Sequence, residues 1–512
     1  MADTENTASE NVANGTYKGR LRIFANCEEV DASNVVKVLN DSLTSFWRNK
    51  AQITFLWNYY KGVQPILERV KDVRPEINNT IVENHAQEIV AFKIGYQLAE
   101  PLQYTCRMQG DDKEDGEGES LYERTLNHVN ELNTFMFAED KASCDRDLFE
   151  WMCVCGLGYR MCESNAWFEE EGGAPFSVFT LDPRNTFVVE SSAYHHRPVM
   201  SVWVGTVPDS EQEVYNVYTD TTYFKIVGGE IVEERPHTYG SNPIVEYRLN
   251  NARMGVFEPV LSLLDAINSV ESNRLDDIEQ TVQALMKFVN CDIEEDDFVE
   301  MLKLGAVKVK TSIDGQPADI DVIKTELDQN GTQVTKEDLY QSVVNICGMP
   351  NRNGTKGSSS DTGAAVLLRD GWTLAESHAK SYELQFKRSE RRFLRVVLSI
   401  CRQSSDTNLD LRIRDIELAF NRRNYENILV KAQVLTTMLQ TNKIHPQLAF
   451  QACGLFTDPD AAYKQSCEYM EQNKASFEES ALAVAAQQAI DEGKKPGPQA
   501  AVPGREEGDG AA

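Results

Sequence analysis

PVLSLLDAINSVESNRLDDIEQTVQALMKFVN, residues Pro259–Asn290, contains no glycine or proline after its first residue. Proline suits the first turn of a helix, because the N–H that it lacks has no partner there. The stretch predicts a single helix over 259–290, about 48 Å long at 1.5 Å per residue. Apolar residues recur along it in alternating steps of four and three, at Leu275, Ile278, Val282, Leu285 and Val289. Such a helix is too long for a compact domain and suits a shaft beside neighbouring copies, although Asn268 and Glu271 make the seam polar at its start.

The segments after this helix predict an insertion, a second helix, a loop and a third helix. Residues 291–335 open with CDIEEDDFVE, in which six of ten residues are acidic, and continue with the strand-like GAVKVKTSI and ADIDVIKTEL. We expect a small acidic α/β insertion there, and a second helix over 336–349. The polar loop MPNRNGTKGSSSDTG follows. A long helix is then expected over 362–402, with Gly371 as a kink point.

The flanking regions combine helices and strands, which predicts a mixed, helix-rich α+β fold. Residues 31–104 and 121–152 have helical periodicity, with Phe55, Tyr59 and Val63 on one face. Residues 156–248 consist of Val-, Phe-, Tyr- and Thr-rich runs, and Gly228-Gly229 is typical of a hairpin turn. Residues 409–477 are expected to be helical, with core candidates Phe420, Ile428, Val434, Leu435 and Leu439. Residues 1–16 and 476–512 have the composition of disordered tails.

Composition excludes several classes of protein. No apolar run approaches the ~20 residues that span a bilayer, and Met1–Gly15 has no apolar core of a secretory signal. We therefore expect a protein that stays in a cytoplasm-like compartment. The eleven cysteines include one C-x-C pair, Cys153 and Cys155, and no C-x-x-C, which favours buried thiols over a disulfide or zinc framework. The formal net charge of −29 argues against tight gripping of nucleic acid phosphates.

Candidate catalytic and metal-binding motifs are weak, so an enzyme and a cofactor are not expected. GTKGS at Gly354–Ser358 lacks the glycine spacing of a phosphate-binding loop, and a polar helix precedes it. The pair His195-His196 lies in a turn-like context, with no second ligand at metal-binding spacing. The acidic run Glu294, Glu295, Asp296 and Asp297 lacks the alternating ligands of a calcium loop.

Six segments, taken in order, resemble the portal proteins of long-tailed (siphovirus-type) bacteriophages, in the branch with a large N-terminal wing. They span roughly residues 50 to 450, and their order carries more weight than any single match. Lys443–Phe450 departs from the family's usual pattern after the sixth segment. The six are WNYYKGVQPILERV (Trp57–Val70), NHAQEIVAFKIGYQLAEPLQY (Asn84–Tyr104), LDPRNTFVV (Leu181–Val189), LLDAINSVESNRLDDIE (Leu263–Glu279), SDTGAAVL (Ser360–Leu367) and IELAFNRRNYEN (Ile416–Asn427).

The resemblance implies a twelve-subunit ring, the head–tail connector, at one capsid vertex of the virion. Double-stranded DNA would be packaged and ejected through it. The implied parts are a wing (17–258), stem helices (259–290 and 336–349), a clip (291–335), a tunnel loop (350–361), a long wing or channel helix (362–402) and a crown (403–475). Implied partners are the terminase large subunit, a head-completion adaptor, and the major capsid and scaffold proteins, with assembly in the host cytoplasm and no membrane contact.

Specific residues follow as hypotheses from these parts. Arg352, Asn353 and Lys356 of the tunnel loop would touch DNA phosphates. The clip residues Glu294, Glu295, Asp296 and Asp297 would dock partners. Asp276, Asp277 and Glu279 are candidates for an acidic channel wall, although they would equally suit contacts between subunits.

Two other readings stay open at this point. The chain would also suit an acidic structural adaptor or minor head protein that does not enclose DNA. A nucleic-acid-processing enzyme is the third reading, and no residue constellation supports it.

Overall fold

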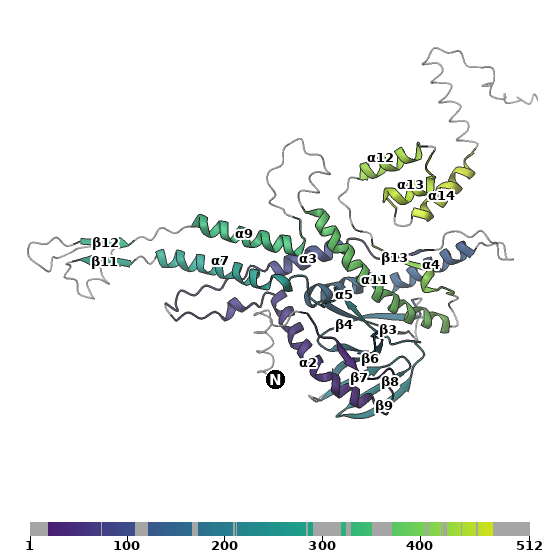
Figure 1. Cartoon of the computed structure of the whole chain (residues 1–512), viewed down its shortest axis with the longest axis horizontal. Helices are drawn as coiled ribbons and strands as arrows, with labels where there is room; N and C mark the ends of the chain where they lie inside the picture. The colour runs from purple at the N-terminus through teal and green to yellow at the C-terminus, as the bar shows by residue number, and fades with distance from the viewer. Residues whose placement is uncertain are drawn as a thin grey trace, which may run out of the picture. The chain divides into compact units, whose positions relative to one another are not determined.

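The computed structural model describes residues 19–474, except 73, 108–120, 166–172, 208–209, 211, 283–284, 290–318, 324–328, 351–370, 405–406, 408, 421, 423–427, 442 and 457–458. The chain forms two compact units, one up to Arg423 and one from Asn424 onward. The first unit mixes helices with sheets, so the predicted α+β class is confirmed (Figure 1).

A six-stranded sheet fills much of the predicted strand region. Its order is β1-β5-β6-β7-β8-β9; β1 is parallel to β5 and all other neighbours are antiparallel. Helix α2 (Val35–Tyr60) covers it with Val35, Leu39 and Phe46, which pack in one cluster with Val189 and Val202. The strands are β1 (Ile23–Ala25), β5 (Thr186–Ser191), β6 (Pro198–Thr206), β7 (Glu213–Tyr218), β8 (Thr222–Val227) and β9 (Glu230–Pro236).

Two local predictions about this region have opposite outcomes. The hairpin at Gly228-Gly229 is confirmed, since both residues have positive φ (62° and 86°) between β8 and β9. Val63 was expected on one helix face with Phe55 and Tyr59, and this is wrong. Helix α2 ends at Tyr60, and Val63 is 59% exposed, because Gly62 turns the chain away with φ of 94°.

A second sheet, of three strands in the order β10-β3-β4, belongs to the same unit as the six-stranded sheet. Helices α5 (Lys141–Cys155) and α11 (Trp372–Gln403) pack on it, and α3 (His85–Gln97) and α4 (Leu121–Ala138) belong to the same unit. The strands are β10 (Ile244–Arg248), β3 (Leu157–Ser164) and β4 (Phe176–Leu181). Cys153 and Cys155 are buried free thiols of α5, as expected.

The helix expected over 259–290 is too long by several residues. A short 3-10 turn at Glu258–Val260 leads into α7, Leu261–Val282, which spans about 33 Å. Leu285–Val289 instead form β11, paired antiparallel with β12 (Asp319–Ile323). The helical periodicity of these residues is overridden because a distant segment, β12, supplies hydrogen-bond partners for a strand. The strand expected in ADIDVIKTEL is confirmed over Asp319–Ile323.

Two further helix boundaries differ from expectation. Helix α9 begins at Gln329, earlier than the expected residue 336, and ends at Cys347. The kink expected at Gly371 is wrong. Gly371 has φ of 82°, which no helical residue adopts, and it stands immediately before the first residue of α11. Residues 362–370 of the expected helix lie outside the described residues.

The second unit is helical in its described part, with α12 (Ile428–Leu439), α13 (Pro446–Cys453) and α14 (Pro459–Gln472). Its buried apolar residues are Ala449, Phe450 and Cys453 of α13. The expected core residues Val434 and Leu439 are 40% and 42% exposed. Strand β13 (Ile416–Ala419), expected to open the crown, pairs with β2 (Gln103–Cys106) of the first unit, and Phe420 packs there too.

Candidate functional site

Helices α7 and α9 run side by side (Figure 1). In the chain β11 follows α7 and β12 precedes α9, and the two strands pair with each other. Polar side chains join them. Lys336 of α9 places its Nζ 2.8 Å from Glu271 of α7 and 2.9 Å from Glu83. Arg274 donates to Gln329 over 2.8 Å and to a second glutamine, Gln333, over 3.1 Å. The polar seam expected from Glu271 is therefore confirmed.

The segment between α2 and α3 lies along α7 and is held by its polar residues. Asn268 accepts from the Glu83 N–H over 2.8 Å, and Ser272 Oγ accepts from the Ile81 N–H over 2.9 Å. Both Asn268 and Ser272 are fully buried. Polar residues on the helix seam thus satisfy the backbone of a neighbouring loop, which an apolar seam would leave unpaired.

Asp276 is the most heavily bonded residue of this contact. It accepts from the backbone N–H and side chain of Asn79, at 2.8 and 2.9 Å, and from Lys71, and Arg69 lies 3.2 Å away. Desolvation raises the pKa of its carboxyl, but the hydrogen bonds from Lys71 and Asn79 outweigh it and hold that pKa below its usual value. Asp276 is only 3% exposed, so its charge is compensated within the subunit.

The two other acidic residues proposed for a channel wall lie differently. Asp277 is exposed and Glu279 is half-buried. They therefore carry the accessible acidic charge of this turn of α7. A role for any of the three in lining a channel stays a prediction. Arg352, Asn353 and Lys356 lie outside the described residues, as do Glu294, Glu295, Asp296 and Asp297.

A buried lysine holds the chain immediately before residues 351–370. Lys93 of α3 is 4% exposed, and its Nζ donates to the Gly348 carbonyl over 3.0 Å. Burial lowers the pKa of this ammonium to about 8. Gly348 has φ of 60°, and a Cβ there would lie 2.7 Å from the His378 ring. Lys93 thus fixes the end of α9, where carbonyls have no helical donor.

Helix α11, which begins immediately after residues 351–370, is anchored by a buried carboxylate. Glu390 lies 3.0 Å from Lys141 Nζ and 3.2 Å from Arg160 Nη1, and it accepts from the hydroxyls of Tyr104 and Tyr247. Desolvation raises the pKa of Glu390, but the two cations and the two hydroxyls outweigh it and lower that pKa to about 2. A carboxylate this saturated with donors is a structural anchor and a poor base.

Asp145 completes the same cluster. It accepts from Lys141 over 2.8 Å and from Arg160, so two buried cations face two buried carboxylates. The cluster joins α5, β3 and α11 of the first unit. Sequence reasoning missed both Glu390 and Lys93. The only local signal was a charged residue inside an apolar run, as in IVAFKIGYQL.

Alternative chemistries find little support among the described residues. They contain no group of three His, Cys, Asp or Glu side chains placed to hold a metal ion. His195 and His196 lie in a turn, where His196 has φ of 46°. Burial raises the pKa values of the Cys153 and Cys155 thiols, which keeps them protonated. No helix in the described ranges is long and apolar enough to cross a membrane.

A comparison with protein-family models gives a match over most of the chain. The family model described as "Phage portal protein, SPP1 Gp6-like" matches residues 40–480. A search of curated proteins finds no match. Among solved structures, a chain from "Virion of native gene transfer agent (GTA) particle" is similar at 12% identity, with a TM-score of 0.43, over 79% of this chain and 93% of that one.

Proposed function

Because the chain belongs to the SPP1 Gp6-like family of phage portal proteins, we propose that twelve copies form a ring at one capsid vertex and enclose the path of double-stranded DNA. The family match over residues 40–480 is the observation that carries this function. Helices α7 and α9 would form the stem of each subunit. The segment between α7 and α9, which includes β11 and β12, would form the clip that docks the terminase large subunit and later the head-completion adaptor.

The anchors on both sides of residues 351–370 support a loop that acts in the channel. Lys93 holds the end of α9, and Glu390 holds α11. A loop whose flanking helices are both held in place would present its residues at a reproducible position. Arg352, Asn353 and Lys356 would make brief phosphate contacts there and resist backward movement of DNA.

The acidic charge of the chain supports sliding of DNA past the wall. Each subunit adds a formal charge of −29. If Asp277 and Glu279 face the bore, DNA meets repulsion from them and is not held by the wall. The work of packaging would then come from a separate ATPase, because the chain has no phosphate-binding loop motif.

Images of the purified full-length chain test the ring directly. We expect rings with a central hole in negative-stain or cryo-electron micrographs. Single subunits or closed caps at high protein concentration would instead favour the acidic adaptor that does not enclose DNA. Nuclease or ATPase activity lost on Lys356→Ala would favour the enzyme.

The tunnel loop and the wall are tested separately once rings are seen. For the loop, Arg352→Ala with Lys356→Ala should let packaged DNA slip back, and unchanged DNA retention argues against the loop contacts. For the wall, Asp277→Lys with Glu279→Lys should slow DNA movement by adding attraction. The matched control is Glu337→Lys with Asp338→Lys on α9, which changes charge equally elsewhere on the helix pair.

A further inference from the structure

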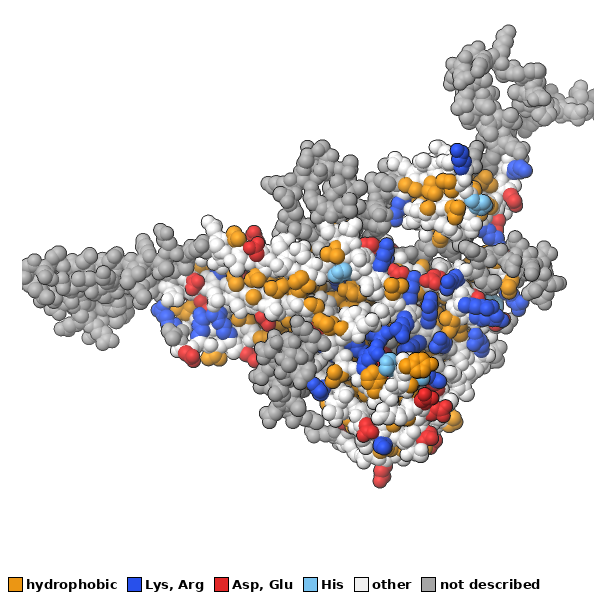
Figure 2. Space-filling view, in the orientation of Figure 1, with side chains coloured by type: hydrophobic (Ala, Val, Ile, Leu, Met, Phe, Trp, Pro, Cys, Tyr) orange, Lys and Arg blue, Asp and Glu red, His pale blue; other side chains and the backbone are white. Residues whose placement is uncertain are grey.

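Positive charge gathers around α11 on this acidic chain. Figure 2 shows Lys and Arg side chains concentrated in the middle of one face. Helix α11 supplies four arginines within eight residues: Arg388, Arg391, Arg392 and Arg395. Such a concentration stands out in a chain whose formal net charge is −29. Acidic residues lie elsewhere on the surface but do not neutralise this face, so its excess of positive charge needs a physical reason.

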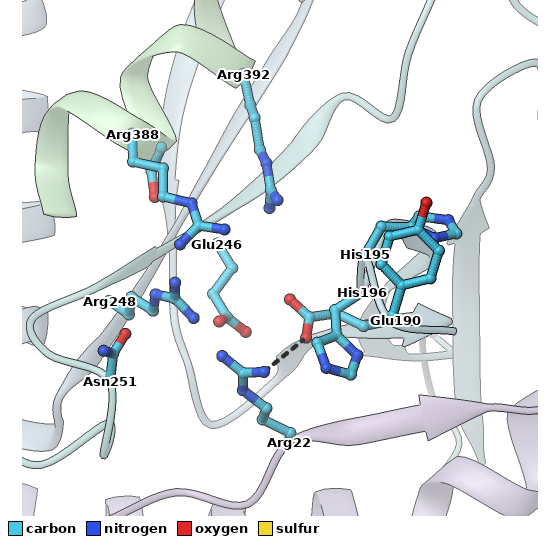
Figure 3. A pocket seen from close by; sticks show the side chains of 11 residues that line it. Arg22, Glu190, His195, His196, Glu246, Arg248, Asn251, Arg388 and Arg392 are labelled. Atoms are coloured by element: carbon cyan, nitrogen blue, oxygen red, sulfur yellow. Dashed lines mark ion pairs between the residues drawn. The ribbon is translucent and has the colours of Figure 1, made fainter. Parts of the chain in front are cut away.

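Two of these arginines face two others across a cavity of about 260 Å³. Arg388 and Arg392 approach from α11, Arg248 from the end of β10, and Arg22 from the residue before β1. Figure 3 shows the four guanidinium groups turned toward a common space, into which the carboxylates of Glu246 and Glu190 also point. The remaining lining residues are Glu190, Tyr194, His195, His196, Glu246, Asn251 and Ser389.

The carboxylates of the pocket leave these arginines poorly paired. Glu246 is already bound by Arg253, which lies outside the lining, at 2.6 Å. Glu190 reaches Arg22 only at 4.0 Å. Among the described residues, Arg388 and Arg392 have no hydrogen-bonded or ion-paired partner.

The electrostatics of the pocket arginines also favour a bound anion. Desolvation lowers the pKa of Arg248, and the charges of three arginines, Arg388, Arg253 and Arg22, lower it further against an opposing effect of Glu246. Desolvation also lowers the pKa of Arg392; the charge of Glu190 raises it, and that of Arg388 lowers it, with a net lowering. Desolvation and mutual repulsion of the arginines are therefore offset only in part by the carboxylates of the pocket, and an anion bound between the guanidinium groups would offset them further.

We propose that this pocket binds a phosphate-type oxyanion through Arg22, Arg248, Arg388 and Arg392. A planar guanidinium donates two parallel hydrogen bonds to a phosphate, and a phosphate has enough oxygens to accept from several guanidinium groups at once. A single carboxylate has two oxygens and would leave most of these donors unpaired. The phosphate is either free in solution or part of a polynucleotide backbone.

Calorimetric titration of the full-length protein with inorganic phosphate, at constant ionic strength, tests this site. We expect saturable binding and a rise in the midpoint of thermal unfolding. Arg388→Gln with Arg392→Gln should weaken binding by about tenfold or more, since two charge-assisted contacts are lost. The matched control Arg391→Gln with Arg412→Gln removes equal charge from exposed positions outside the pocket and should leave binding unchanged.

Two further arms identify the source and exclude a general salt effect. Binding of a short DNA duplex that is also lost in Arg388→Gln with Arg392→Gln assigns the phosphate to a polynucleotide, and binding of inorganic phosphate alone assigns it to free anion. Acetate at equal ionic strength should produce no comparable shift. The proposal is overturned if phosphate does not bind, if acetate acts equally, or if the pocket variant binds like the wild type. None of these outcomes depends on ring formation.

Discussion

Helix α11 carries two charged clusters, and they differ in how their charges are matched. Around Glu390, two cations and two tyrosine hydroxyls meet two carboxylates in a fully buried site. Around Arg388 and Arg392, two residues away on either side of Glu390, guanidinium groups face one another in an open pocket. A buried charge needs a matched partner for folding, whereas an unmatched charge at the surface stays available for a ligand. Lys93 is intermediate, because it is buried with only a carbonyl as its hydrogen-bond acceptor.

The largest expected effect comes from removing the shared carboxylate. Glu390→Leu leaves Lys141 and Arg160 with one carboxylate and takes the acceptor from two tyrosine hydroxyls. We expect a loss of about 3–5 kcal/mol in the free energy of unfolding, measured by guanidinium denaturation. Glu383→Gln on the same helix is the control, and its more exposed ion pairs should contribute about 1 kcal/mol or less. Equal effects of the two variants would contradict a matched buried cluster.

The same cluster predicts an acid-dependent stability. The pKa of Glu390 is lowered from 4.5 to about 2 in the folded state. Its contribution is therefore fully present above pH 4.5 and is lost as the pH falls toward 2. The shift corresponds to about 3 kcal/mol. The gap between wild type and Glu390→Gln, followed by denaturant titrations across this window, should narrow as the pH falls, and a constant gap would show that Glu390 titrates normally.

Lys93 should give a second rise of stability with pH, in the alkaline range, because here the folded state disfavours the charged form. Its pKa is lowered from 10.5 to about 8, so the folded protein disfavours the charged form that the unfolded chain retains up to pH 10.5. Stability therefore rises as the pH increases through this window. Between pH 7 and 10, wild type should gain about 2 kcal/mol relative to Lys93→Met in chemical unfolding. Parallel pH profiles of the two proteins would mean that the ammonium is well solvated.

The smallest effect is expected in the unmatched cluster. In a buffer without phosphate, Arg392→Gln removes repulsion from Arg388 together with attraction to Glu190, and it breaks no ion pair. The free energy of unfolding, measured by thermal unfolding, should therefore change by no more than about 0.5 kcal/mol. Arg160→Gln in the matched cluster should cost several times more, about 3 kcal/mol. A comparable loss in both variants would show that Arg392 has a structural role.

The sequence by itself determined the α+β class, the hairpin at Gly228-Gly229, the polar helix seam and, through six ordered segments, the portal family. These features depend on local periodicity, turn chemistry and composition, which short windows of sequence record. Only the tertiary structure decided where α7 ends, because the strand partners of Leu285–Val289 lie in Asp319–Ile323, farther along the chain than a short window of sequence reaches. It also decided which charges are matched. Glu390, Arg392 and Asp276 look alike as charged residues in helical patterns, and their different roles follow from side chains that the fold brings to them from other elements.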